Sequence, residues 1–67
     1  MPDIKDVGQR LRALRGNLSR RKVAELCGIS VSALAMYESG ERMPRDEIKV
    51  KLAELYGKSV GSIFFAK

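Results

Sequence analysis

The sequence predicts an all-α protein, a compact bundle of five short helices. Three observations favour this fold class. Apolar residues recur at helical spacing in the first and last thirds of the chain, serines, glycines and an internal proline mark helix starts and ends, and no segment is a convincing strand. With 67 residues, of which 45% are apolar and 31% charged, the chain has the size and composition of one globular domain, which we place over residues 1–67.

The first helix is expected over residues 4–15. Four apolar residues recur there at i, i+3, i+7 and i+10 and therefore share one face. They are Ile4, Val7, Leu11 and Leu14. Gly16 and Asn17 then supply a left-handed helix end and a tight turn.

Two short helices should follow, each introduced by a serine. Ser19 precedes residues 20–27, and Ser30 precedes a segment that runs to about residue 39. A serine in this position caps a helix because its hydroxyl accepts a hydrogen bond from the first turn. Gly28 separates the two helices and Gly40 ends the second one.

Pro44 marks the next boundary, because the residue before a proline resists the helical conformation. Asp46 and Glu47 then suit the first turn of a fourth helix, where acidic side chains complement the helix dipole. Residues 48–52 also alternate like a strand, but the length of the segment and its acidic start favour a helix. The apolar face of this helix comprises Ile48, Leu52, Leu55 and Tyr56. Ser59 can cap a last short helix through Phe64.

The positive charge is concentrated in one part of the chain. The formal net charge is +5, and residues 10–22 contain no acidic side chain. Their basic residues are Arg10, Arg12, Arg15, Arg20, Arg21 and Lys22. Such a cluster in a small domain indicates a nucleic-acid-binding protein, although a solvated helix face gives the same pattern.

Composition argues against catalysis, metal binding and membrane insertion. The chain has no histidine, the commonest general base and zinc ligand, and its single cysteine excludes an internal disulfide. The longest apolar run, residues 33–37, is far shorter than the roughly 18 residues that span a bilayer. No secretory signal is visible at the N-terminus. We therefore expect a cytoplasmic protein with no enzyme activity, no metal and no cofactor.

Residues 20–39 have the pattern of two short helices that cross at a steep angle. Ala24 lets the second helix approach the first, and Gly28 takes the positive φ of the turn. Five positions can be buried, namely Val23, Cys27, Ile29, Leu34 and Tyr37. Together with residues 19–24 (SRRKVA), 28–30 (GIS) and 38–40 (ESG), this pattern resembles the helix-turn-helix of the lambda-repressor-like (Cro/Xre) family. The resemblance extends over nearly the whole chain.

The resemblance implies how the chain would contact double-stranded DNA. Residues 30–39 correspond to the recognition helix, which lies in the major groove in this family. The predicted base contacts are Val31, Ser32, Ala35 and Met36. The predicted phosphate contacts are Ser19, Arg20, Arg42, Arg45 and Arg10, with Arg20 standing where the family usually has glutamine. The recognition face has no Arg, Lys, Asn or Gln, so base recognition would depend on serine hydroxyls and on apolar contact with thymine methyls.

Two further features are predicted. The family has an arginine and a glutamate at the places of Arg15 and Glu38, which implies a structural ion pair between them. A weak homodimer is expected to form around Val50, Ser62 and Phe65. Val50 lies off the core stripe, and residues 63–65 carry more apolar surface than one short helix can bury.

The sequence thus predicts a small repressor-like transcriptional regulator, bacterial or phage-encoded, that binds a two-fold DNA operator as a homodimer. The alternative is a protein-interaction module of the same fold, such as an antitoxin or antirepressor partner. That module would use the apolar face of Val31 and Met36 or the end of the chain at residues 64–65. The positive field of residues 10–22 favours DNA, because a protein groove does not need it.

Overall fold

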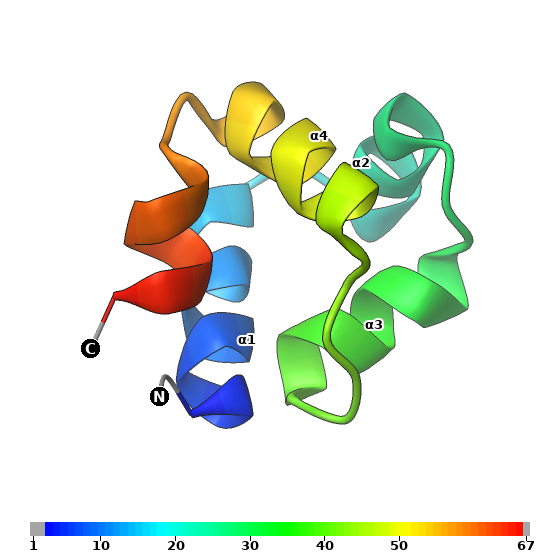
Figure 1. The fold of residues 1–67 in the computed structure, drawn as a ribbon. Helices are drawn as coiled ribbons and strands as arrows, with labels where there is room; N and C mark the ends of the chain where they lie inside the picture. The colour runs from blue at the N-terminus through cyan, green and yellow to red at the C-terminus, as the bar shows by residue number, and fades with distance from the viewer. Residues whose placement is uncertain (1–2, 67) are drawn as a thin grey trace.

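The structure, a computed structural model, describes residues 3–66, and every regular element within them is helical (Figure 1). The elements are α1 (Ile4–Arg15), α2 (Arg20–Cys27), α3 (Val31–Ser39), α4 (Asp46–Tyr56) and η1, a π-helical turn (Gly61–Phe65). The predicted all-α bundle of five short helices is confirmed. None of these elements is long and apolar enough to cross a membrane.

Side-chain caps fix the starts of the first three helices. Asp3, Ser19 and Ser30 each accept a hydrogen bond from a main-chain N–H of the first turn, at 2.8, 3.1 and 3.0 Å. Gly28 and Gly40 end α2 and α3 in the left-handed region, with φ of 69° and 79°. The boundaries of α2 and α3 are therefore encoded by the residues that flank them.

The C-terminal element differs in kind from the expected helix. The Ser59 hydroxyl accepts a hydrogen bond from the main-chain N–H of Ser62 at 3.1 Å, so the predicted cap is present. The turn that follows is π-helical and includes Phe65. Such turns have i→i+5 hydrogen bonds and are rare. Ile63 and Phe64 in this turn are buried, whereas Phe65 is 58% exposed.

All five elements contribute to one apolar core. Both α3 and η1 pack against α1, and α2 packs against α3 and α4. In Figure 1, α1 (blue) and the C-terminal turn (orange to red) lie next to each other on one side of the molecule. The buried core residues are Val7, Leu11, Val23, Cys27, Leu34, Tyr37, Leu52, Ala53, Ile63 and Phe64. This core fixes α3 against the rest of the bundle.

The contact between α1 and α3 is made backbone to backbone at two glycines. A β-carbon at Gly8 would collide with the main-chain carbonyl oxygen of Glu38 and would lie 2.8 Å from that of Tyr37. A β-carbon at Gly40 would lie 2.9 Å from the α-carbon of Lys5. Side chains at these two positions would hold the helices apart, so glycine sets how closely α1 supports the end of α3.

Candidate nucleic-acid interface

Helices α2 and α3 form a helix-turn-helix whose crossing is fixed by buried residues. Ala24 is 2% exposed, and its carbonyl oxygen accepts a hydrogen bond from the main-chain N–H of Ile29 at 2.9 Å. Gly28 lies between them with φ 69° and ψ 34°. Of the five positions expected to be buried, Val23, Cys27, Leu34 and Tyr37 are buried and Ile29 is partly exposed.

The four residues predicted to contact bases all lie on α3, but their exposure differs. Val31 is 45% exposed, and Ser32 is also exposed. Ala35 and Met36, one turn further along, are half-buried. The first turn of α3 is therefore the part that projects furthest. The charged side chain of α3, Glu38, is only 1% exposed, so the helix presents an uncharged surface.

Arg42 and Arg45 lie beside the start of α3. Both are exposed, and both line a shallow groove that also contains Ser30 and Ala33. Glu47 lines the same groove. The loop that carries Arg42 is held to the end of α3, because the main-chain N–H groups of residues 41 and 42 donate to the Met36 carbonyl oxygen at 3.0 and 3.3 Å.

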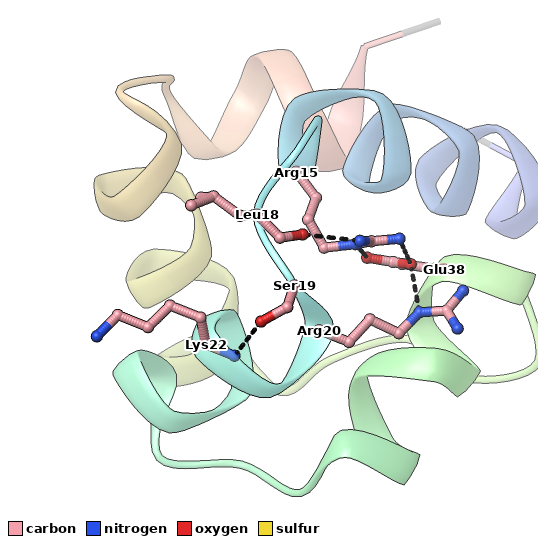
Figure 2. A network of polar contacts seen from close by, with 6 residues as sticks. All are labelled: Arg15, Leu18, Ser19, Arg20, Lys22 and Glu38. Carbon is pink, nitrogen blue, oxygen red and sulfur yellow. Dashed lines mark hydrogen bonds and ion pairs between the residues drawn. The ribbon is translucent and has the colours of Figure 1, made fainter.

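Glu38 connects α1, α2 and α3 through two arginines. Its carboxylate accepts hydrogen bonds from Arg15 Nε at 2.7 Å, from Arg15 Nη2 at 3.1 Å and from Arg20 Nε at 2.9 Å (Figure 2). The ion pair expected between Arg15 and Glu38 is present. The hydrogen bond to Glu38 raises the pKa of the Arg15 guanidinium, against the opposing effect of burial. Arg15 is also held by the Leu18 carbonyl oxygen, which accepts from Nη1 at 2.8 Å.

The structure gives Arg20 a partner that the sequence prediction did not include. Its Nε donates a hydrogen bond to Glu38. The glutamine that the family usually has here is neutral. An arginine carries a charge that the buried carboxylate of Glu38 attracts, but the closeness of the two groups is known only from the fold. The Arg20 side chain remains 41% exposed, so part of its guanidinium is accessible.

The structure gives Arg10, which was predicted to contact a phosphate, two partners within the chain. Its Nη1 and Nη2 donate to the main-chain carbonyl oxygens of Ile63 and Ala66 at 2.8 and 3.0 Å. The end of a helical segment leaves carbonyl oxygens without intrahelical partners, and a guanidinium can bind two of them at once. Arg10 therefore ties η1 to α1, and both of its terminal nitrogens are engaged there.

Ser19 already makes one polar contact, because its hydroxyl accepts from the main-chain N–H of Lys22 at 3.1 Å (Figure 2). Ser19 is nevertheless exposed, as are Arg21 and Lys22 behind it. The first turn of α2 contains no acidic residue. The start of α2 thus presents a capped helix end beside three basic side chains, Arg20, Arg21 and Lys22.

The residues predicted to form the dimer interface are exposed. Val50 on α4 is 46% exposed and Phe65 on η1 is 58% exposed, and Ser62 is exposed as well. Lys49 lies with its Nζ 5.1 Å from the centroid of the Phe65 ring, so a cation covers part of that ring. The Ser62 hydroxyl donates to the Ser59 carbonyl oxygen at 2.9 Å.

The other reactive groups behave as core residues. Cys27 is buried, and burial raises the pKa of its thiol. Burial also raises the pKa of the Tyr56 phenol to about 12, with smaller contributions from Glu38 and Cys27. Within residues 3–66, no group of three or more Asp, Glu, Cys or His side chains is arranged to hold a metal ion.

The helix pair, its cap residues and its basic surroundings define a DNA-binding domain of the helix-turn-helix class. A family model described as helix-turn-helix matches residues 9–63. The chain belongs to the lambda-repressor-like (Cro/Xre) helix-turn-helix family, whose members are DNA-binding regulatory domains and not typically enzymes. No individual curated protein matches the chain by sequence.

Proposed function

We propose that this protein is a transcriptional regulator of the repressor type that binds a specific site on double-stranded DNA through α3. The observation that carries the proposal is the placement of basic side chains beside a helix whose exposed surface is uncharged. Arg20 is bonded to Glu38 near the end of α3, and Arg42 and Arg45 line a groove together with Ser30 and Ala33. Phosphates flank the major groove on both sides, so this arrangement suits a helix lying in that groove.

Phosphate contacts would set the position and register of the protein on the duplex. Ser19, Arg20, Arg42 and Arg45 are the residues proposed to make them, and such contacts contain no base information. Arg42 or Arg45 would also favour a narrow, A·T-rich minor groove, where the negative potential is enhanced.

Base recognition would come mainly from the first turn of α3. Ser32 is the proposed hydrogen-bonding residue, and Val31 and Met36 would pack against thymine methyls, with Ala35 allowing close approach. Each such contact is weaker than a bidentate pair worth about 1–3 kcal/mol. Specific binding would therefore exceed non-specific binding only modestly, by about 10³-fold.

A two-fold operator would match a homodimer formed through Val50, Ser62 and Phe65. Their exposure supports this part of the proposal. A patch of this size is small compared with stable interfaces, so we propose a weak dimer that tightens on DNA. The protein would act on bacterial or phage DNA in the cytoplasm, without catalysis.

Selection of bound sites from random duplexes, followed by footprinting, tests the proposal directly. We expect a palindromic consensus with protection on one face of the duplex. Binding should also weaken steeply with salt, since each neutralised phosphate contributes a log–log slope of about −0.9. A flat salt response, or selection without a consensus, would contradict the proposal.

A protein-interaction module is the second candidate, favoured by the apolar surface. Among residues 3–66, five large apolar side chains are exposed, namely Leu18, Leu26, Val31, Val50 and Phe65. An antitoxin or antirepressor partner would use such residues, above all Val31 on α3. Its binding to a protein would depend little on salt, which separates it from DNA binding in the same titration.

A further inference from the structure

The network of ion pairs around Glu38 contains more positive than negative charges. One carboxylate, 1% exposed, accepts hydrogen bonds from two guanidinium groups. Both oxygens are engaged by Arg15, and one of them also accepts from Arg20 Nε. The three side chains together therefore have one excess positive charge, located on Arg20, the most exposed of the three at 41%.

The orientation of Arg20 is set by its single bond to Glu38. Nε is the Arg20 atom that donates to Glu38, and in Figure 2 the two terminal nitrogens lie at the far end of the guanidinium, beyond that bond. A guanidinium has five N–H donors in a fixed plane, so binding at Nε leaves a terminal edge for a second anion. Arg15, at 15% exposure, is the anchored member that keeps Glu38 in place.

We propose that Glu38 is a positioning residue for DNA-backbone recognition, holding Arg20 so that its terminal nitrogens bind one phosphodiester of the duplex. The proposal rests on the proposed function, and it adds that the contact needs the geometry of an arginine. The phosphodiester anion would neutralise the excess charge of the network. Since Glu38 and Arg15 also connect α3 to α1, this phosphate contact would be in register with the recognition helix.

Lysine cannot replace arginine in this arrangement. An ammonium group is a single point charge on a flexible stem, so it would bind Glu38 or the phosphate but would not bridge the two in one plane. If Arg20 acted only as a positive charge in the field, lysine would serve equally well.

The test compares a charge-conserving and a neutral substitution of Arg20 on a selected operator duplex. The variants are Arg20→Lys, Arg20→Gln and, as a control, Arg12→Lys, which changes an exposed arginine of α1 in the same way. We expect Arg20→Lys to weaken binding about as much as Arg20→Gln, on the order of tenfold in Kd, since a charge-assisted hydrogen bond is lost in both. Arg12→Lys should bind as the parent does. The proposal would be overturned if the Kd of Arg20→Lys were closer to that of the parent than to that of Arg20→Gln. It would also be overturned if both lysine variants weakened binding equally.

Glu38→Gln provides a second measurement with opposite expectations. Removing a negative charge near DNA should tighten binding if only the field matters, whereas loss of the positioning carboxylate should weaken it at least severalfold. Circular dichroism and thermal melting establish that the variant is folded, and the Arg20 variants decide the question if it is not. Failure of the parent protein to bind any duplex would overturn the proposed function itself. If the parent binds the duplex and Arg20→Lys binds it nearly as tightly, only the positioning role of Glu38 is overturned.

Discussion

Gly8 of α1 lies directly against the main-chain carbonyl of Glu38, with no room for a side chain between the two helices. The same glutamate uses its side chain to hold Arg15 and Arg20. The backbone of Glu38 is therefore held by close contact with Gly8, and its side chain is held by the two arginines. The position of the recognition helix depends on both contacts.

Gly8→Ala should destabilise the fold by about 1–3 kcal/mol, the usual cost of overpacking. Alanine is the better helix former by up to about 1 kcal/mol, but here its methyl group would meet backbone that cannot rotate away. Gly61→Ala is the matched control, because nothing lies within 4 Å of a β-carbon there. Urea denaturation of both variants measures the difference. Equal stability of the two variants would contradict the close approach.

Glu38→Ala should destabilise the protein by about 3–5 kcal/mol. The substitution leaves Arg15 mostly buried and without its partner, with a second positive charge on Arg20 close by. Glu25→Ala, at an exposed position on α2, should change stability by less than about 0.5 kcal/mol. Thermal denaturation at neutral pH compares the two variants. Unchanged stability of Glu38→Ala would mean that the ion pairs do not hold the helices together.

Tyr56→Phe should stabilise the protein by about 1 kcal/mol at pH 7, because the buried phenolic oxygen has no hydrogen-bond partner among the described residues. Its effect should grow at alkaline pH. Burial raises the pKa of Tyr56 from its usual 10.0 to about 12. Below pH 10 the phenol is protonated in both folded and unfolded chains. Between pH 10 and about 12 the unfolded chain loses the proton first, so the parent loses stability as the pH rises.

Between pH 10 and about 12, the loss in the free energy of unfolding should not exceed about 2 kcal/mol, since Tyr56 is only half-buried as a whole. Urea denaturation at pH 7, 10 and 11 measures the profile. The Tyr56→Phe variant should lack this part of the alkaline decline. If the stability of the parent and of Tyr56→Phe declined in parallel, the alkaline decline would come from titratable groups other than Tyr56.

Met36→Ala should relax the preference at one or two base pairs while leaving the salt slope unchanged, because an apolar contact neutralises no phosphate. Arg20→Ala should instead lower affinity for every sequence alike. Binding of both variants to operator and scrambled duplexes at two salt concentrations distinguishes them. If Met36→Ala and the parent bound every sequence with the same affinity, Met36, which is half-buried on α3, would make no contribution to base recognition.

Phe65→Ser should weaken the proposed dimer about tenfold without unfolding the chain, because the ring is 58% exposed in the monomer and would be buried by the partner. Leu26→Ser, at a side chain of similar exposure on α2, is the control and should leave self-association unchanged. Analytical ultracentrifugation with and without operator measures both variants. A parent protein that stays monomeric free and on DNA would overturn the dimer.

Local signals in the sequence predicted most of the fold. The caps at Ser19 and Ser30 and the left-handed glycines at residues 28 and 40 depend on neighbouring residues alone, so they can be recognised without tertiary information. The π-helical form of η1 could not be predicted, because π-helical turns are rare and no residue pattern in the sequence marks one.

The candidate site was predicted less completely, because its long side chains choose among distant partners. Arg10 binds carbonyl oxygens more than fifty residues away in sequence, and Arg20 binds a glutamate eighteen residues away. Nothing in the spacing of these arginines separates a phosphate contact from a structural one. Gly8 gave no signal either, since a glycine inside a helix shows its purpose only when the facing backbone is known.

The hydrogen bonds from Arg10 to the carbonyl oxygens of Ile63, in the middle of the final turn, and Ala66, just after it, have a consequence for symmetry. In the proposed dimer, η1 and α4 would make the contact between the two copies, and Arg10 holds η1 against α1. The angle between η1 and α1 would then influence the distance between the two recognition helices, and hence the number of base pairs that separate the half-sites of an operator. A side chain that is bound within its own subunit would in this way influence the spacing between the half-sites of the operator.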